Sequence, residues 1–252
     1  MLRGLTAIAI AWGIAAAPAQ AVTVPLAVER GERVQVATST PAQLAAGNQR
    51  LGQLPGSQVQ VAEARGGKLQ LGQWQAQSLN VRPTGQQGRV WIDGRWYRGN
   101  LRLVRRGGSI TAINRVGLES YLYSVIAAEM PAVWPMAALK AQAVAARSYV
   151  LAHMREGEAP FATNQDFQVY EGLDSEYSSG RRAVRATRGI VLMRGGQIAK
   201  TLYAAEQELA ENRWGRGMGQ KEAKQLAKRG WSWQQVLGEF YPQAKLATLG
   251  QP

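Results

Sequence analysis

One carboxylate in this 252-residue chain stands where its acidity should change. Glu129 comes eleven residues after Leu118, which is three helical turns plus a small offset, so on a helix it shares the apolar stripe of Leu118 and Leu122. Such a helix ends at Met130-Pro131, and the free carbonyls of its last turn disfavour a negative charge. Burial and the helix dipole both raise the expected pKa of Glu129. A carboxyl group that keeps its proton near neutral pH suits glycosidic cleavage, because the leaving oxygen must be protonated.

A structural role is the alternative for Glu129. A nearby cation such as Arg147 would pair with the carboxylate and keep it charged, as part of the packing of the helices. The local pattern leaves both roles open.

Other catalytic chemistry has few residues to work with. The chain has no cysteine and one histidine, His153, whereas transition-metal sites use several such ligands, so we expect no metal and no cofactor. A Ser-His-Asp or Cys-His mechanism would depend on His153 without a recognisable nucleophile elbow. The glycines of residues 215–219 lack a preceding strand and a Walker lysine, so they do not predict a phosphate-binding loop.

Charge and the first residues indicate where the protein acts. With 30 Lys and Arg against 17 Asp and Glu, the formal charge of +13 favours polyanionic partners. Arg3, an apolar stretch over 5–17 and Ala19-Gln20-Ala21 have the pattern of a secretory signal peptide at residues 1–21. We therefore expect an extracytoplasmic protein, in the periplasm, cell wall or medium, with peptidoglycan as partner. Membrane contact would be transient, through the signal peptide, and no nucleic acid is expected, despite the Arg-rich stretch 181–188.

The elements that must position Glu129 follow from periodicity. Residues 22–87 alternate apolar and polar positions between Gly, Pro and Asn, which predicts a β-rich accessory region. Within it, the stretch 42–54 is rich in Ala and Gln, and one short helix or a loop is an alternative to strands there. Two hairpins are predicted next, around Asp93-Gly94 and Gly107-Gly108.

Helices dominate the remainder. One is predicted from Leu118 to Met130, and a longer one, Ala-rich and free of breakers, over 136–154 with Pro135 in its first turn. A hairpin over 190–203 and closing helices over 221–228 and 233–240 follow. The expected fold is α+β: a signal peptide at 1–21, a β-rich accessory region at 22–87, and a mixed helix and hairpin catalytic domain at 88–252.

Dense motifs surround Glu129. They run over residues 116–122, 127–135 and 138–149, continue through 166–172 to Tyr203, and return more weakly over 215–246. These motifs resemble the stage II sporulation protein D family, also called the amidase-enhancer family. Its members are peptidoglycan lytic transglycosylases, or act beside wall amidases.

The resemblance implies that Glu129 is the catalytic acid, in agreement with its position on the helix. In a transglycosylase the C6 hydroxyl of the muramic sugar attacks within the glycan strand and leaves a 1,6-anhydro end, so no second carboxylate is needed. Glu129 would donate its proton and then take the hydroxyl proton. By resemblance, residues around this site also bind substrate. These candidates are Arg147, Tyr121, Trp134, Lys140, Gln142, Tyr170 and Arg216.

Five of the binding candidates have a plainer interpretation. Arg147, Lys140 and Gln142 fit helix surface or packing roles, and Tyr121 and Trp134 fit the core as well as a sugar platform.

The carboxyl-terminal part departs from the family pattern. Relatives have a Gly-Gly-Thr loop near Tyr203, a long insertion, and a Gly-His-Gly segment that ends in Ser-Gln. This chain has Ala204-Ala205-Glu206-Gln207, lacks the insertion, and carries Arg216 in place of the histidine. Two hypotheses remain: a lytic transglycosylase that uses Glu129, and a non-catalytic wall-binding protein that positions or stimulates an amidase.

Overall fold

The computed structural model describes residues 22–250 except 86, 158, 164–166 and 215–216. The predicted signal peptide and Arg216 lie outside the described residues. Strands in the amino-terminal part are followed by helices and short hairpins, which confirms the α+β class. The chain forms two compact units that alternate along the sequence. The β unit contains residues 23–121 and 159–175, and the helical unit contains residues 122–158 and 176–250.

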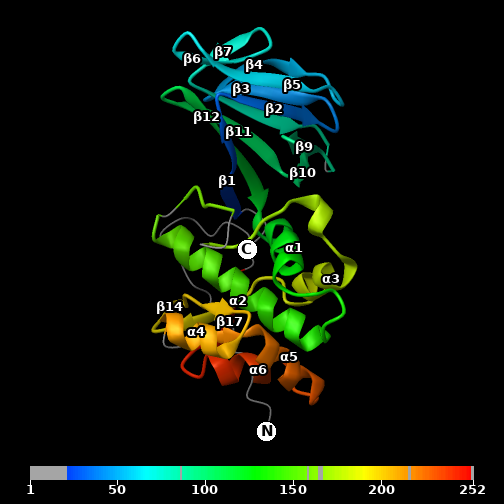
Figure 1. The fold of residues 1–252 in the computed structure, drawn as a ribbon, viewed down its shortest axis with the longest axis vertical. Coiled ribbons are helices and arrows are strands. Elements are labelled where there is room, and N and C mark those ends of the chain that lie inside the picture. The colour runs from blue at the N-terminus through cyan, green and yellow to red at the C-terminus, as the bar shows by residue number, and fades with distance from the viewer. Residues whose placement is uncertain (1–21, 86, 158, 164–166, 215–216, 251–252) are drawn as a thin grey trace. The chain divides into compact units, whose positions relative to one another are not determined.

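Two antiparallel six-stranded sheets make up the β unit (Figure 1). Alternation along each strand buries one face, as in β8, where Leu79 and Val81 are fully or almost fully buried. The first sheet has the order β1 (Thr23–Gly31), β12 (Ser109–Gly117), β11 (Asn100–Arg106), β8 (Ser78–Pro83), β3 (Ala42–Ala46) and β4 (Gln49–Leu54). The second has the order β10 (Arg95–Arg98), β9 (Arg89–Ile92), β2 (Arg33–Thr38), β5 (Gln60–Arg65), β6 (Lys68–Leu71) and β7 (Trp74–Ala76).

The two hairpins predicted from turn residues are confirmed. β9 and β10 join at Asp93 and Gly94, both with positive φ, which is the geometry that Asp-Gly turns favour. The interpretation of 42–54 as a helix or loop is wrong, because these residues form the β3–β4 hairpin. Ala42 and Leu44 are buried while Gln43 is exposed, a period of two that the short side chain of alanine makes faint in the sequence.

Residue 88 does not divide the compact units. Strands from both sides of it share each sheet, since β9 pairs with β2 and β11 pairs with β8. A later segment returns to the β unit: Phe161 pairs with Leu26 of β1, and η1 (Leu173–Ser175) packs on β10. A division into family domains at residue 88 stays a prediction.

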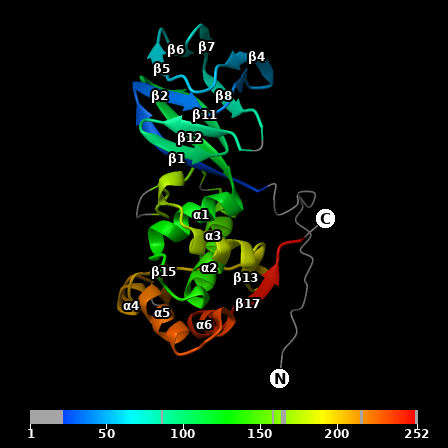
Figure 2. The ribbon, with the colours of Figure 1, turned by 90° about the vertical axis from the view of Figure 1, so that its right-hand side faces the viewer.

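Helix α2 (Met136–Arg155) is the centre of the helical unit (Figures 1 and 2). Its alanines are buried, and their small size allows α3, α5, α6 and β13 to pack closely around it. Pro135 lies at the N-cap, one residue before the predicted first turn. Before α2 comes α1 (Leu118–Glu129), and Pro131 follows its end as predicted. The other elements are α3 (Ser178–Ala186), β13 (Ile190–Arg194), β14 (Gln197–Ile198), β15 (Tyr203–Ala204), α4 (Gln207–Trp214), β16 (Met218–Gly219), α5 (Gln220–Lys228), α6 (Trp233–Phe240) and β17 (Lys245–Thr248).

The late hairpin and both closing helices are confirmed as β13–β14, α5 and α6. Among the described residues, none of the helices combines the length and the apolar character needed to cross a bilayer.

Candidate functional site

Glu129 is the last residue of α1 and is half-buried in the helical unit. Its Oε2 accepts a hydrogen bond from Nε2 of Gln220 at 2.8 Å, and Gln220 is itself 4% exposed. The apolar stripe used to predict this position is present, since Leu118, Leu122 and Val125 are buried. The carboxyl group therefore lies against protein rather than in bulk water.

Burial raises the pKa of Glu129 above its ordinary value, and the hydrogen bond from Gln220 offsets part of that rise. Desolvation is the larger cause because the amide of Gln220 supplies one neutral donor, which stabilises the anion less than water would. The expected direction of the pKa shift is confirmed.

Tyr177 holds the end of α1 in place. Its hydroxyl donates to the carbonyls of Ile126, at 3.3 Å, and of Met130. The Ile126 carbonyl also accepts from the backbone N–H of Met130, so the Tyr177 hydroxyl adds a second donor to the last turn of the helix. Burial raises the pKa of Tyr177 to about 12, so the hydroxyl keeps the proton that it donates. Gly180 lets the ring approach, because a Cβ there would lie 2.9 Å from the Tyr177 ring.

A pair of two-residue strands places Gln220. β15 and β16 pair in parallel, Ala204 opposite Gly219, so that Gln220 begins α5 directly after the strand. Gly219 is needed for close approach, since a Cβ would lie 2.6 Å from the backbone nitrogen of Gln207. α4 occupies the connection between these strands, where the family pattern has its long insertion.

α5 connects Glu129 with Trp134. Gln220 and Lys224 are four residues apart and share one face of α5. Gln220 donates to Glu129, while Nζ of Lys224 lies 4.8 Å from the centroid of the Trp134 ring. Helix α5 thus contacts both Glu129 and Trp134, the latter predicted from the resemblance, and the half-buried Trp134 ring packs against a cation.

Arg147 lies inside the helical unit and is fully buried. Its guanidinium donates to the carbonyls of Ile190 at 3.1 Å and Val184 at 3.4 Å, which tie α2 to β13 and α3. This placement leaves no surface of Arg147 for a sugar.

The other two candidates on α2 differ in exposure. Gln142 is fully buried, and within the described structure neither of its amide atoms has a hydrogen-bond partner. Lys140 is half-buried.

Tyr121 and Tyr170 meet in the β unit, where both are buried and their ring centroids lie 5.5 Å apart. Tyr121 donates to Oε1 of Gln168 at 2.6 Å, and Tyr170 donates to Oδ1 of Asn114 at 2.9 Å. With Tyr97, whose ring is 5.7 Å from that of Tyr170, they form the tyrosine cluster. Tyr121 is fully buried and Tyr170 almost fully, and both hydroxyls donate within this unit, so neither ring is available to a sugar.

Sequence reasoning missed Gln220, Lys224 and Tyr177. Gln220 did carry a signal, because it stands where the family segment Gly-His-Gly ends in Ser-Gln. Lys224 and Tyr177 carried none, since their contacts with Trp134 and the end of α1 join residues far apart in the chain.

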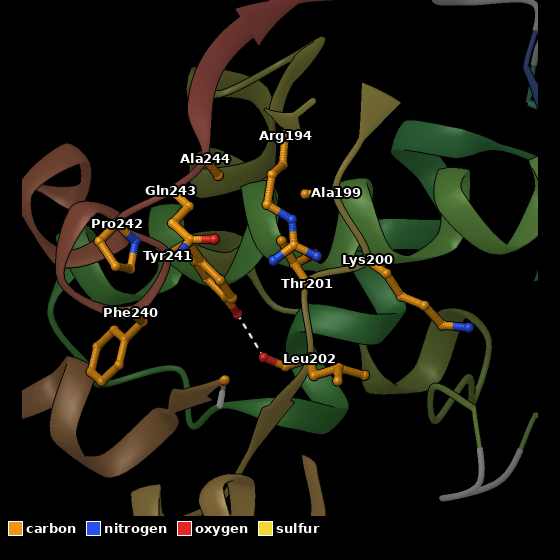
Figure 3. Close-up of a pocket in the computed structure, with 11 residues that line it drawn as sticks. Arg194, Ala199, Lys200, Thr201, Leu202, Phe240, Tyr241, Pro242, Gln243 and Ala244 are labelled. Carbon is orange, nitrogen blue, oxygen red and sulfur yellow. Dashed lines mark hydrogen bonds between the residues drawn. The ribbon is translucent and has the colours of Figure 1, made fainter. Parts of the chain in front are cut away.

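A small pocket lies elsewhere in the helical unit (Figure 3). Its volume of about 150 Å³ is below the roughly 300–1,000 Å³ of ordinary ligand sites. Tyr241 donates across it to the carbonyl of Leu202 at 2.7 Å, while Lys200 points away and pairs with Glu156 at 3.0 Å. Glu129 does not line this pocket, which is too small for a glycan.

Comparisons with known proteins agree with the sequence motifs. Residues 106–193 match the family model described as Stage II sporulation protein, SpoIID. An uncharacterized protein of Brachyspira hyodysenteriae is 33% identical over 118 residues, 45% of this chain and 32% of that protein. The Amidase enhancer of Bacillus subtilis is 33% identical over 132 residues, 51% of this chain and 18% of its own length. Stage II sporulation protein D of Bacillus subtilis is 31% identical over 120 residues, 40% of this chain and 35% of its own length.

These matches confirm the resemblance: residues 106–193 of the chain match the SpoIID family, and two of the similar proteins are named Amidase enhancer and Stage II sporulation protein D. The chain spans about a third or less of the length of these relatives. Glu129 falls inside the matched residues and Gln220 falls beyond them.

Proposed function

We propose that this protein acts outside the cytoplasm on the bacterial cell wall, as a lytic transglycosylase that cleaves peptidoglycan glycan strands with Glu129 as its acid and base. The observation that carries the proposal is the state of Glu129: a half-buried carboxyl group whose pKa is raised by burial, held by one amide donor. The match of residues 106–193 to the SpoIID family supports a role at the cell wall.

The two carboxyl oxygens have different parts in the proposed reaction. Oε2 accepts from Gln220, so Oε1 carries the proton and donates it to the glycosidic oxygen as the bond to C1 breaks. The hydrogen bond from Gln220 then stabilises the carboxylate that remains. That carboxylate removes the proton from the C6 hydroxyl of the muramic sugar as its oxygen bonds to C1, which gives the 1,6-anhydro end and returns Glu129 to its protonated form.

Muropeptide analysis tests the proposal. Purified sacculi treated with the protein should release 1,6-anhydro muropeptides, and Glu129→Gln should lower their rate of formation by about 10²–10⁴-fold, the usual contribution of a positioned acid or base. Glu208→Gln, which removes an exposed carboxylate in the same unit, is the matched control and should keep the rate. Anhydro products formed equally fast by Glu129→Gln would reject the assignment.

A second function rests on one of the relatives. The similarity to a protein named Amidase enhancer supports a non-catalytic protein that binds the wall and positions or stimulates an amidase. In that case sacculi keep intact glycan strands, while the protein raises the rate at which an added wall amidase releases stem peptides, with wild type and Glu129→Gln equally effective.

A further inference from the structure

A broad groove runs over the solvent-facing side of the first sheet of the β unit. Its volume is about 640 Å³, within the range of ligand sites. Strands β3, β8, β11 and β12 supply its floor, and every lining residue belongs to the β unit. The arginine and amide side chains of its floor are Gln43, Asn80, Arg82, Asn100, Arg102 and Arg115.

The register of the strands arranges these side chains in two rows. Arg82 stands opposite Gln43, and Asn100 stands opposite Arg115. Because Val81 pairs with Leu101, the next step of the same register brings Arg82 opposite Asn100. The first row therefore reads Gln43, Arg82, Asn100, Arg115.

The second row is displaced from the first by two residues along each strand. In it Arg102 stands opposite Asn80. Arginine and asparagine thus alternate both along and between the rows, and the register sets no arginine directly opposite another. This arrangement keeps three positive charges on one face without the cost of like charges in direct opposition.

The groove is positively charged and open to solvent. Arg82, Arg102 and Arg115 are exposed, and none of the described residues that line the groove is acidic. A guanidinium binds a carboxylate through two parallel hydrogen bonds, and the amides between the arginines can both donate to and accept from hydroxyl and amide groups.

The spacing of the arginines selects the kind of anion. Neighbouring strands lie roughly 4.8 Å apart and two residues along a strand cover roughly 6.7 Å, so these arginines stand about 8–10 Å from one another. Duplex DNA presents one charge per roughly 1.7 Å, and single strands are usually bound on stacking aromatic side chains. The groove has sparse charges and no aromatic residue among its described lining, so nucleic acid fits it poorly.

We infer that this groove binds a glycan strand that carries carboxylates at intervals, with the arginines on the carboxylates and the amides on the sugar hydroxyl and amide groups. The peptide-bearing strands of peptidoglycan have this chemistry. The groove is a binding site separate in sequence from Glu129, and its role does not depend on whether Glu129 is catalytic.

Cosedimentation of the full-length protein with sacculi stripped of other polymers tests the inference. Replacing Arg82, Arg102 and Arg115 together by Gln should weaken binding about tenfold, because each exposed ion pair contributes modestly. The matched control replaces three exposed cations outside the groove, Arg65, Lys68 and Arg229, and should bind within about twofold of wild type. Arg102→Glu, a single reversal in the second row, should weaken binding on its own and serves if the triple variant fails to fold.

Two further arms identify the ligand. Sacculi whose carboxyl groups have been amidated should bind about as weakly to wild type as untreated sacculi bind to the triple variant. Double-stranded DNA should compete poorly at 150 mM salt. Equal binding by the triple variant and its control, equal binding to amidated sacculi, or efficient competition by DNA would overturn the inference. Since binding is measured without cleavage, its failure is distinct from failure of the Glu129 assignment.

Discussion

The Glu129–Gln220 pair of the helical unit and the tyrosine cluster of the β unit both hold polar groups away from water, but they satisfy those groups differently. In the cluster, each neutral hydroxyl of Tyr121 and Tyr170 donates to an amide oxygen. Asn114 in turn donates to the carbonyls of Arg98 and Asn100, so the network is anchored in the strands. Glu129 is an ionisable group that receives one hydrogen bond from Gln220 and has a raised pKa.

The difference separates stability from chemistry. Burying neutral polar groups costs little free energy when each has a hydrogen-bond partner, and such a network favours one packed arrangement of the core. A half-buried carboxyl group with one donor is a poor way to stabilise a fold, because its charged form is penalised. Its raised pKa keeps a proton on the group, available for donation, at a higher pH than an ordinary carboxyl group would. Arg147 is charged, but its fully buried guanidinium donates to the carbonyls of Ile190 and Val184, so we assign it a packing role like that of the cluster.

Arg147→Met should have the largest effect on stability. It removes the hydrogen bonds that a fully buried guanidinium donates to the carbonyls of Ile190 and Val184, although the Val184 carbonyl still accepts from Thr187. We expect a loss of about 2–4 kcal/mol in the free energy of unfolding, measured in urea. Lys140→Met, on the same helix but half-buried, is the control, with a change of about 0.5 kcal/mol or less. If the Arg147→Met protein were stable but had lost its activity on the wall, Arg147 would have a role in substrate binding rather than in packing.

Tyr170→Phe should be milder. It deletes the hydrogen bond to Asn114 and leaves that amide oxygen buried, at a cost of about 1–2 kcal/mol in thermal or urea unfolding. Activity per folded molecule should not change. Tyr123→Phe, in a half-buried position, controls for loss of a hydroxyl. Unchanged stability with weakened substrate binding would mean that the cluster contacts sugar after all.

Glu129→Gln should change stability in a way that depends on pH. A raised pKa means that the folded state binds the proton more tightly than the unfolded state, so this stabilisation is present in acid and is lost as the pH rises through the raised pKa. The neutral Gln variant should therefore gain stability relative to wild type between pH 4 and pH 8 in urea unfolding. Glu208→Gln corrects for the general loss of one charge. A difference that shrinks toward pH 8 would contradict the assigned shift.

Gln220→Met should have the smallest effect. It should shift the pH dependence of the rate of anhydro-product formation. Loss of its hydrogen bond removes the contribution that lowers the pKa of Glu129, so the alkaline limb of the rate of anhydro-product formation should move to higher pH. Gln225→Met, exposed on the same helix, should leave the profile in place. A lower rate with an unmoved profile would show that Gln220 supports the fold alone.

Local signals in the sequence accounted for much of the fold. Pro131 marked the end of α1, Asp93-Gly94 marked a hairpin, and the unbroken alanine run marked α2, because each depends on near neighbours in the chain. The β3–β4 hairpin was missed since alanine fits helix and strand alike, and pairing with β8 decided between them.

The sequence alone also predicted the direction of the pKa shift of Glu129, because a helical stripe and a helix end are local properties. Only the tertiary structure decided which groups surround it. Gln220 is 91 residues away, and the carbonyls that Arg147 serves come from two other elements. Tertiary contacts decide whether a polar side chain is buried with hydrogen-bond partners or stays available for chemistry. Residue type and spacing in the sequence do not specify those contacts.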